Sequence, residues 1–324
     1  MDHVTITHRT ITTNGIDMHI AEAGAGPLVV LLHGFPELWY AWRHQLEFLA
    51  AAGYHAVAPD QRGYGASTAP SGIDQYTLLH LVGDVVGLIG VLGDEQCYVV
   101  GHDWGSQVAA NTALWRSDLV RGVALLSVPY RQRSDQDMRA MMRDALGPRN
   151  YVEFFQEPGV AERVLEVDPR AALCSILIAG AAGAPQAFIG SEIEKGDDLL
   201  IGGAGTALPG WLTDDDLDFI GAEFGRTGFG GGLNWYRNAT RNWELTAPWY
   251  GAALTVPSMF ACGTEDQVYS RPGMAAAIDQ LRYTTMPGLV KTVILAGCGH
   301  WIQQERPDAV SDLLVDFLEG LRNS

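Results

Sequence analysis

The sequence predicts an α/β protein in which a mostly parallel sheet is flanked by helices and interrupted by one helical insertion. Apolar, strand-like runs alternate with helix-length segments through the first 129 residues, strand signals then stop, and the alternation returns from about residue 256. This alternation is typical of parallel strands covered by helices on both faces. We therefore expect a core domain of residues 1–129 and 247–324, and a helical cap domain of residues 130–246.

The elements of the core are predicted from hydrophobic periodicity. The expected strands of the first part are residues 4–11, 17–23, 28–32, 55–59, 97–101 and 122–128. The last four of these are continuous apolar runs, as expected for strands buried on both faces. Helices are expected at residues 38–52, 77–92 and 106–115. Beyond the insertion we expect strands at 259–262 and 292–295 and helices at 273–281 and 308–321.

The insertion contains one clear helix start. Thr213 offers an N-cap hydroxyl, and three aspartates come after it at residues 214–216. Acidic side chains in a first turn complement the positive end of the helix dipole, so a helix is predicted to begin there.

Composition excludes several classes of function. The chain has 21 basic and 38 acidic residues, a net charge of −17, so its surface should repel nucleic acid and anionic lipid. Neither a signal peptide nor a stretch of about 18 apolar residues is present, which favours a cytoplasmic protein without a membrane segment. Four well-separated cysteines without a CxxC pair argue against disulfides and a zinc site: Cys97, Cys174, Cys262 and Cys298.

The central chemical signal is the motif GHDWG at residues 101–105, between an apolar run and a helix. A strand, a sharp turn with small residues and a helix make a nucleophile elbow, whose middle side chain enters the cleft. That residue is Asp103. An isolated aspartate before a helix is more often only a helix cap, so the interpretation as a nucleophile depends on partner residues further along the chain.

A base and an orienting acid are both present downstream. A carboxylate nucleophile forms an ester, and hydrolysis of the ester requires an activated water. LAGCGHW ends a predicted strand at His300, and MFACGTED ends another at Asp266. Each alone is more often structural, but the order nucleophile, acid, histidine predicts a catalytic triad.

The segment HGFPE, residues 33–37, comes directly after the strand expected at 28–32 and should lie beside the elbow. The backbone amides of Phe35 and Trp104 are then candidates for an oxyanion hole, which would stabilise charge on the ester carbonyl. Pro36 is a candidate for a cis peptide bond.

These motifs resemble those of the soluble epoxide hydrolases, which have the α/β-hydrolase fold with an inserted cap. The resemblance covers nearly the whole chain, through HGFPELWYAWRHQ, PDQRGYGAS, VVGHDWG, FQEPG, TGFGGGLNWYRN, GTED and GCGHWIQQERP. It implies that Tyr151 and Tyr236 of the cap hold and protonate the epoxide oxygen, and that Glu37 helps position the hydrolytic water. It also implies an epoxide as the small-molecule substrate, with no metal or organic cofactor.

Three alternatives stay open. Haloalkane and haloacid dehalogenases share the Asp elbow, but Phe35 stands where the haloalkane enzymes carry a halide-binding asparagine. A ligand-binding protein could keep the fold without turnover, although its usual mark is a broken triad. A serine esterase is disfavoured because Ser106 lies on the helix side of the elbow rather than at its apex. Oligomeric state is left open, with a homodimer as one option.

Overall fold

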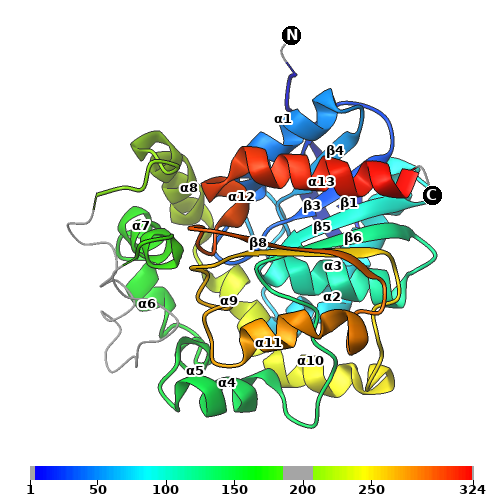
Figure 1. Ribbon diagram of the computed structural model, residues 1–324. Coiled ribbons are helices and arrows are strands. Elements are labelled where there is room, and N and C mark those ends of the chain that lie inside the picture. The colour runs from blue at the N-terminus through cyan, green and yellow to red at the C-terminus, as the bar shows by residue number, and fades with distance from the viewer. Residues whose placement is uncertain (1–3, 185–206, 323–324) are drawn as a thin grey trace.

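The computed structural model describes residues 4–184 and 207–322, and its centre is an eight-stranded sheet (Figure 1). The spatial order of the strands is β1-β2-β4-β3-β5-β6-β7-β8. Their bounds are β1 Thr7–Thr13, β2 Ile16–Ala23, β3 Leu28–Leu32, β4 His55–Pro59, β5 Cys97–His102, β6 Val120–Leu126, β7 Ser258–Gly263 and β8 Leu289–Leu295. The first three strands in this order pair antiparallel, and all pairs from β4 to β8 are parallel.

Helices cover both faces of this sheet. The core helices are η1 Trp39–Trp42, α1 Arg43–Ala51, η2 Ile73–Tyr76, α2 Leu78–Leu92, α3 Trp104–Trp115, α11 Met274–Asp279, η6 Leu281–Tyr283, α12 Ile302–Glu305 and α13 Pro307–Arg322. In Figure 1, α1 and α13 lie on one face of the sheet, and α2 and α3 lie on the other.

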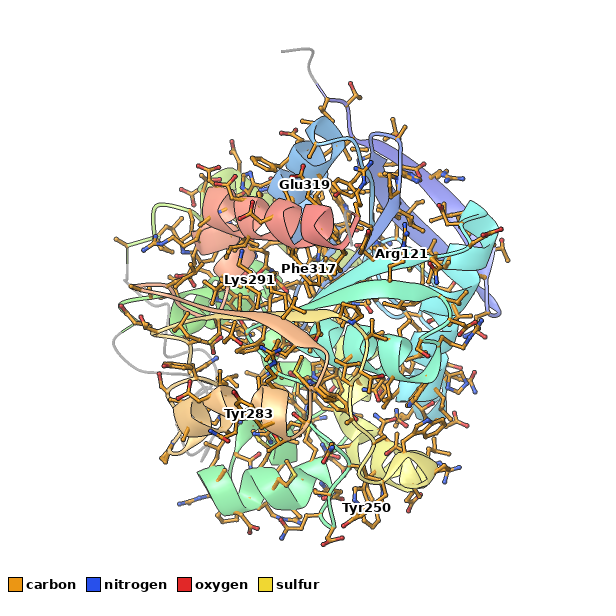
Figure 2. All side chains as sticks on the ribbon, turned by 45° about the vertical axis from the view of Figure 1, so that its right-hand side comes forward. Arg121, Tyr250, Tyr283, Lys291, Phe317 and Glu319 are labelled. Carbon is orange, nitrogen blue, oxygen red and sulfur yellow. The ribbon has the colours of Figure 1, made fainter. Side chains whose placement is uncertain are left out.

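The side chains of β3 show why both layers form. Val29 and Leu31 pack with α1 and α13, whereas Val30 and Leu32 pack with α2 and α3. Because successive residues of a strand point to opposite faces, a continuous apolar run needs a helical layer on each side. α13 packs on the sheet through apolar side chains, as Figure 2 shows for the buried Phe317, which faces the sheet.

Between β6 and β7 the described residues form helices and no strand longer than a single bridge. These are α4 Met138–Leu146, α5 Tyr151–Phe154, α6 Glu162–Leu165, α7 Pro169–Gly180, α8 Asp214–Thr227, α9 Gly230–Arg237, α10 Ala239–Leu245 and η5 Ala247–Trp249. The predicted start of α8 is confirmed, because Thr213 and Asp216 form a reciprocal capping box.

Buried polar contacts join this helical segment to the sheet-forming part of the chain. The indole Nε1 of Trp235 in α9 donates to the carbonyl oxygen of Arg62 at 3.2 Å. The side-chain oxygen of Asn242 in α10 accepts from the backbone N–H of Leu78 at 2.7 Å, at the start of α2. These bonds hold α9 and α10 over the sheet edge where the candidate catalytic residues lie.

All eight expected strands are confirmed, although some of their ends differ by two or three residues. The first strand runs from Thr7 to Thr13 rather than over 4–11, because its pairing with β2 begins at Thr7. The helix expected at 38–52 is divided into η1 and α1, and α3 begins at Trp104 rather than at 106. These ends depend on strand pairing and on the bend at Asp103, which local periodicity does not report.

Candidate active site

Asp103 stands at the bend between β5 and α3, with φ 52° and ψ −119°. A positive φ is uncommon for a residue other than glycine and stores strain in the backbone. The two glycines of the motif make the bend sterically feasible. A Cβ atom on Gly101 would collide with the Gly105 carbonyl oxygen, and one on Gly105 would collide with the Leu32 carbonyl oxygen. The elbow predicted from GHDWG is therefore confirmed in its geometry.

Two groups contact the Asp103 carboxylate. Its Oδ1 accepts a hydrogen bond from the backbone N–H of Phe35 at 3.0 Å, and its Oδ2 lies 3.6 Å from Nε2 of His300. Burial acts to raise the pKa of this carboxyl, but the contact with His300, the charge of His102 and the hydrogen bond from Phe35 together outweigh burial, and the pKa is lowered. Asp103 is therefore ionised at neutral pH, as a nucleophile must be.

His300 is oriented by a second carboxylate. Its Nδ1 lies 3.2 Å from each oxygen of Asp266, whose side chain is fully buried. Asp266 Oδ1 also accepts from the backbone N–H of Val268 at 2.7 Å, which fixes the carboxylate. Burial acts to lower the pKa of His300, but the charge of Asp266 and the contacts with Asp103 raise it well above its ordinary value. The imidazole is thus held between two acids.

Topology explains why these side chains meet. Phe35 follows β3, Asp103 follows β5, Asp266 follows β7 and His300 follows β8, all of which are parallel strands. The carboxyl ends of parallel strands share one edge of a sheet. β6 contributes Ser127, whose hydroxyl donates to the His300 carbonyl oxygen at 2.7 Å. The peptide bond between Phe35 and Pro36, a candidate in the sequence, is cis.

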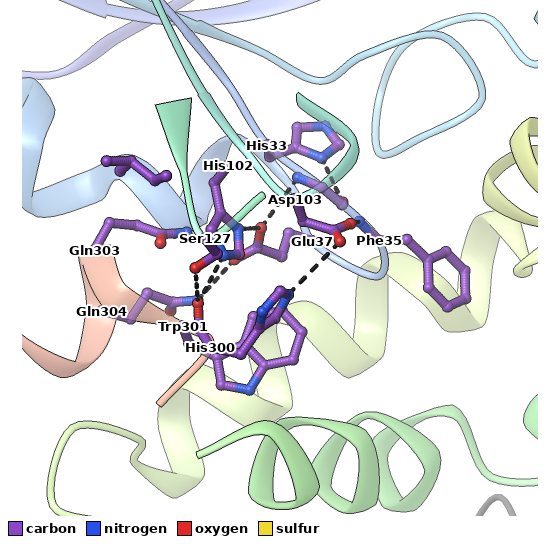
Figure 3. A network of polar contacts seen from close by, with 12 residues as sticks. His33, Phe35, Glu37, His102, Asp103, Ser127, His300, Trp301, Gln303 and Gln304 are labelled. Atoms are coloured by element: carbon purple, nitrogen blue, oxygen red, sulfur yellow. Dashed lines mark hydrogen bonds and ion pairs between the residues drawn. The ribbon is translucent and has the colours of Figure 1, made fainter. Parts of the chain in front are cut away.

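Glu37 is buried beneath the elbow rather than solvated at its mouth (Figure 3). Its Oε2 accepts from the Gly34 N–H at 3.0 Å and contacts His102 Nδ1 at 2.7 Å. Its Oε1 accepts from the side-chain amides of Gln303 and Gln304 at 3.0 and 3.1 Å. Four polar partners surround this one carboxylate. The role in positioning the hydrolytic water, which the sequence led us to expect, stays a prediction.

His102 links Glu37 to the triad, and sequence reasoning did not single it out. Its Nε2 lies 2.8 Å from the backbone carbonyl oxygen of His300, on the far side from Glu37. Burial acts to raise the pKa of Glu37, but the charge and hydrogen bond of His102 and the hydrogen bond from Gly34 together outweigh burial, and the pKa is lowered. The available signal was the position of His102 inside GHDWG, directly before the nucleophile.

The two tyrosines singled out from the sequence face the same cavity as Asp103. Tyr151 is the first residue of α5 and Tyr236 lies in α9, and their ring centroids are 5.9 Å apart. Burial raises the pKa of Tyr151 to about 12, against an opposing charge from Arg271, and burial raises the pKa of Tyr236 well above its ordinary value. Both phenols therefore stay protonated at neutral pH and can donate hydrogen bonds.

Trp104 also borders the cavity. It is the first residue of α3, so its N–H has no acceptor within the helix and is available to an oxyanion. Its ring packs edge to face against that of Tyr236, with the two centroids 5.1 Å apart. Ser106, by contrast, donates its hydroxyl to the carbonyl oxygens of Gly101 and Leu126, so it is committed to the backbone.

The cavity has a volume of about 250 Å³ and extends from Asp103 between the insertion and the sheet edge. Two of its lining residues, Arg131 and Arg271, were not singled out from the sequence. They lie in loops whose sequence carries no motif, so only the folded arrangement brings them together. The segment 199–205, expected to influence pocket shape, lies outside the described residues.

Neither a metal site nor a membrane span is found among the described residues. Over 4–184 and 207–322, no three His, Cys, Asp or Glu side chains gather in a way that could hold a metal ion. In the same ranges, no helix combines the length and apolar character needed to cross a membrane. The four cysteines are free thiols.

Comparisons with known proteins agree with this geometry. Residues 27–174 match the family model described as alpha/beta hydrolase fold. Epoxide hydrolase A of Mycobacterium tuberculosis is 43% identical, with 97% of this chain and 98% of the relative aligned. Epoxide hydrolase 2 of Siraitia grosvenorii is also 43% identical, with the same coverage of both chains.

Solved structures give the same result. An epoxide hydrolase from an endophytic Streptomyces matches with a TM-score of 0.90 and 44% identity, covering 100% of this chain and 98% of that one. An epoxide hydrolase from Vigna radiata matches with a TM-score of 0.87 and 40% identity, covering 97% and 98%.

Proposed function

The chain belongs to the epoxide hydrolases of the alpha/beta hydrolase fold, and we propose that it converts epoxides to vicinal diols through an ester on Asp103. One observation carries the proposal. The Asp103 carboxylate lies between a backbone N–H and a histidine, and two phenols line the same cavity. That set contains a nucleophile, a base and acids for the leaving oxygen, which are the groups that a two-step hydrolysis requires.

In the first step, Oδ2 of Asp103 attacks one carbon of the epoxide. A carbon–oxygen bond forms, and the bond between that carbon and the ring oxygen breaks. The ring oxygen departs with the electron pair and takes a proton from Tyr151 or Tyr236. The raised pKa values of these phenols keep the proton available until the alkoxide forms. Asp103 is left as a hydroxyalkyl ester and one tyrosine as a phenolate.

In the second step, His300 takes a proton from water, and the hydroxide attacks the carbonyl carbon of the ester. Ester formation has removed the negative charge of Asp103, which helped to raise the pKa of His300 in the resting enzyme. The histidine therefore becomes more able to exist as a neutral base once the ester is present. Asp266 holds the ring and balances the charge of the imidazolium that forms.

The tetrahedral intermediate is expected to place its oxyanion where Oδ1 of Asp103 now lies. The N–H of Phe35 already points at that oxygen, and the N–H of Trp104 is the proposed second donor. Collapse expels the second diol oxygen, which takes the proton from His300. The proton left on the Asp103 carboxyl passes to the phenolate, so the enzyme returns to its resting state.

The insertion is the proposed cap domain, residues 130–246, over a core of residues 1–129 and 247–324. Support for this division comes from the position of Tyr151 and Tyr236, which belong to the insertion but line a cavity with Asp103. Every group in the scheme belongs to one chain, so the homodimer left open by the sequence has no part in it. The cytoplasmic location stays a prediction.

The structure also bears on the dehalogenase alternative. The side chain of Phe35 is buried, with its ring centroid 5.6 Å from that of Phe155 and 5.3 Å from that of Tyr236. An aromatic ring at this place offers no amide N–H to a departing halide. The two phenols instead suit an oxygen leaving group, which must be protonated.

Oxygen labelling tests the proposed ester. With enzyme in excess over styrene oxide in H₂¹⁸O, the diol of the first turnover should contain no label, and peptide mass spectrometry should find ¹⁸O in Asp103. Solvent label that appears in the diol of that first turnover, with none in Asp103, would show direct attack by water and would overturn the proposal.

A further inference from the structure

Two arginine side chains line the cavity beside the proposed catalytic groups. Arg131 lies in the loop after β6, and Arg271 lies in the loop after β7 that also carries Asp266. β6 and β7 are neighbours in the sheet, so the two loops emerge side by side. The Arg131 side chain is solvent-exposed at the open side of the cavity, and Arg271 is half-buried. Surrounding protein atoms lower the pKa of Arg131, and the charge of Arg271 lowers it further. The two guanidinium groups are therefore close enough to repel each other.

Neither guanidinium is neutralised by a carboxylate within the described part of the chain. Arg62, which is buried, is by contrast paired with Asp84 at 2.6 Å. Arg271 Nε is buried without a hydrogen-bond partner, and its Nη1 lies 3.7 Å from the sulfur of Met142. An unsatisfied buried donor such as Arg271 Nε costs free energy, and a bound anion would remove that cost.

Arg133 lines the same cavity but is differently engaged. Its Nε donates to the carbonyl oxygen of Trp243 at 2.9 Å, and its guanidinium stacks over the Trp243 ring at 4.2 Å. The contrast with Arg131 and Arg271 shows that this region can satisfy an arginine with its own groups. Arg131 and Arg271 have neither a carboxylate partner nor a stacked ring of this kind among the described residues, and both line the space that a substrate would occupy.

We propose that Arg131 and Arg271 form an anion-binding subsite, and that the enzyme is selective for epoxides with a carboxylate a few bonds from the ring. The proposal rests on the proposed function and adds a substrate class to it. A guanidinium presents paired N–H donors that match the two oxygens of a carboxylate. Two cations also offset the repulsion that such a substrate would experience from the ionised Asp103.

The distance between subsite and ring is set by Tyr151. Arg271 is near enough to Tyr151 for its positive charge to act on the pKa of this phenol, which is one of the two proposed to hold the epoxide oxygen. A carboxylate on Arg271 therefore lies close to the reacting carbons. The small cavity, about 250 Å³, is consistent with a compact substrate whose charged group and ring are bound together.

A matched pair of substrates tests the subsite. We would compare trans-3-phenylglycidate with trans-3-phenylglycidamide, which have nearly the same shape and differ in charge, and measure kcat/KM for each. The quantity of interest is the ratio of acid to amide, because it does not depend on the concentration of folded enzyme. The change in this ratio on substitution cancels the different intrinsic reactivities of the two epoxides.

We expect Arg131→Gln and Arg271→Gln each to lower the acid-to-amide ratio by about tenfold or more, mainly by raising KM for the acid, since a hydrogen bond to a charged group contributes about that factor. Arg133→Gln removes the same charge from the same region. It should change the ratio by less than about threefold if direct contact with the substrate carboxylate, rather than the overall positive charge of the cavity, is responsible. A ratio that is unchanged in all three variants, or lowered equally in all three, overturns the subsite.

The outcomes for the subsite and for the proposed function are distinct. If styrene oxide and the amide are converted but the acid-to-amide ratio of kcat/KM is the same with and without Arg131 and Arg271, the subsite alone is overturned and the reaction stands. If none of the three epoxides is converted to a diol by the wild-type protein, the reaction itself is overturned and the subsite with it.

Discussion

Replacing Glu37 with glutamine is expected to destabilise the protein, because this carboxylate has four polar partners and almost no exposure. Removing one member of a buried charged pair costs about 3–5 kcal/mol. Gln303 Oε1 has no partner and can turn to accept from the new amide, which places the cost near the lower end, about 3 kcal/mol.

That cost translates into a measurable thermal shift. Unfolding entropy near 2.1 cal/mol/K per residue gives about 0.7 kcal/mol/K for this chain, so Glu37→Gln should lower Tm by about 4 °C. Circular dichroism or scanning fluorimetry at pH 7 measures the shift. Glu95→Gln, at an exposed glutamate, is the matched control and should change Tm by less than about 1 °C.

The same variant distinguishes two roles for Glu37. If the carboxylate is committed to its four partners, Tm falls. If it instead faces the hydrolytic water, Tm is unchanged and only the hydrolysis of the ester is slower in single-turnover experiments. An unchanged Tm in Glu37→Gln would therefore refute the reasoning from these hydrogen bonds.

Three further predictions concern the catalytic groups. His300→Gln should accumulate the ester, seen by intact-mass spectrometry as protein plus one substrate, whereas Asp103→Asn should show no adduct. A His300→Gln protein that consumes epoxide without forming an adduct would contradict the scheme. Tyr151→Phe and Tyr236→Phe should each slow ester formation by about 10²–10³-fold in stopped-flow experiments, since each removes one donor from the developing alkoxide, and wild-type rates in either would remove that tyrosine from the mechanism. The unfolding free energy should fall as pH rises above about 6.5, because the pKa of His300 is higher in the folded than in the unfolded protein. The stability from this shift is fully present below the unfolded pKa and is lost as pH rises through the folded pKa. In urea titrations the loss should be smaller in Asp103→Asn, and an equal loss would argue against coupling between Asp103 and His300.

The architecture could be predicted because it depends on local patterns. The apolar run at Leu28–Leu32 is long enough for a strand and has no polar face, so it must be buried on both sides. The glycines around Asp103 likewise report a bend whose steric requirements are local. Strand ends were less accurate, because the ends depend on which neighbour pairs with each residue.

The members of the proposed triad were accessible from sequence for a related reason. Asp103, Asp266 and His300 each follow an apolar strand, and parallel strands place their carboxyl ends at one edge. Topology alone therefore brings residues that are far apart in the chain to the same place. No distance had to be known.

The partners of Glu37 and the loops bearing Arg131 and Arg271 required the tertiary structure. A glutamate in a turn is usually solvated, and only the approach of His102, Gln303 and Gln304 makes this one a buried acceptor.

The kind of chemistry is encoded locally in the sequence, because a carboxylate at a sharp bend, an acid and a histidine in this order are carried by short motifs. The electrostatic setting of that chemistry arises only when the chain folds. Charges interact through space over a few ångströms, so whether Arg131 and Arg271 face a carboxylate or an open cavity is a property of the folded chain and not of its local segments.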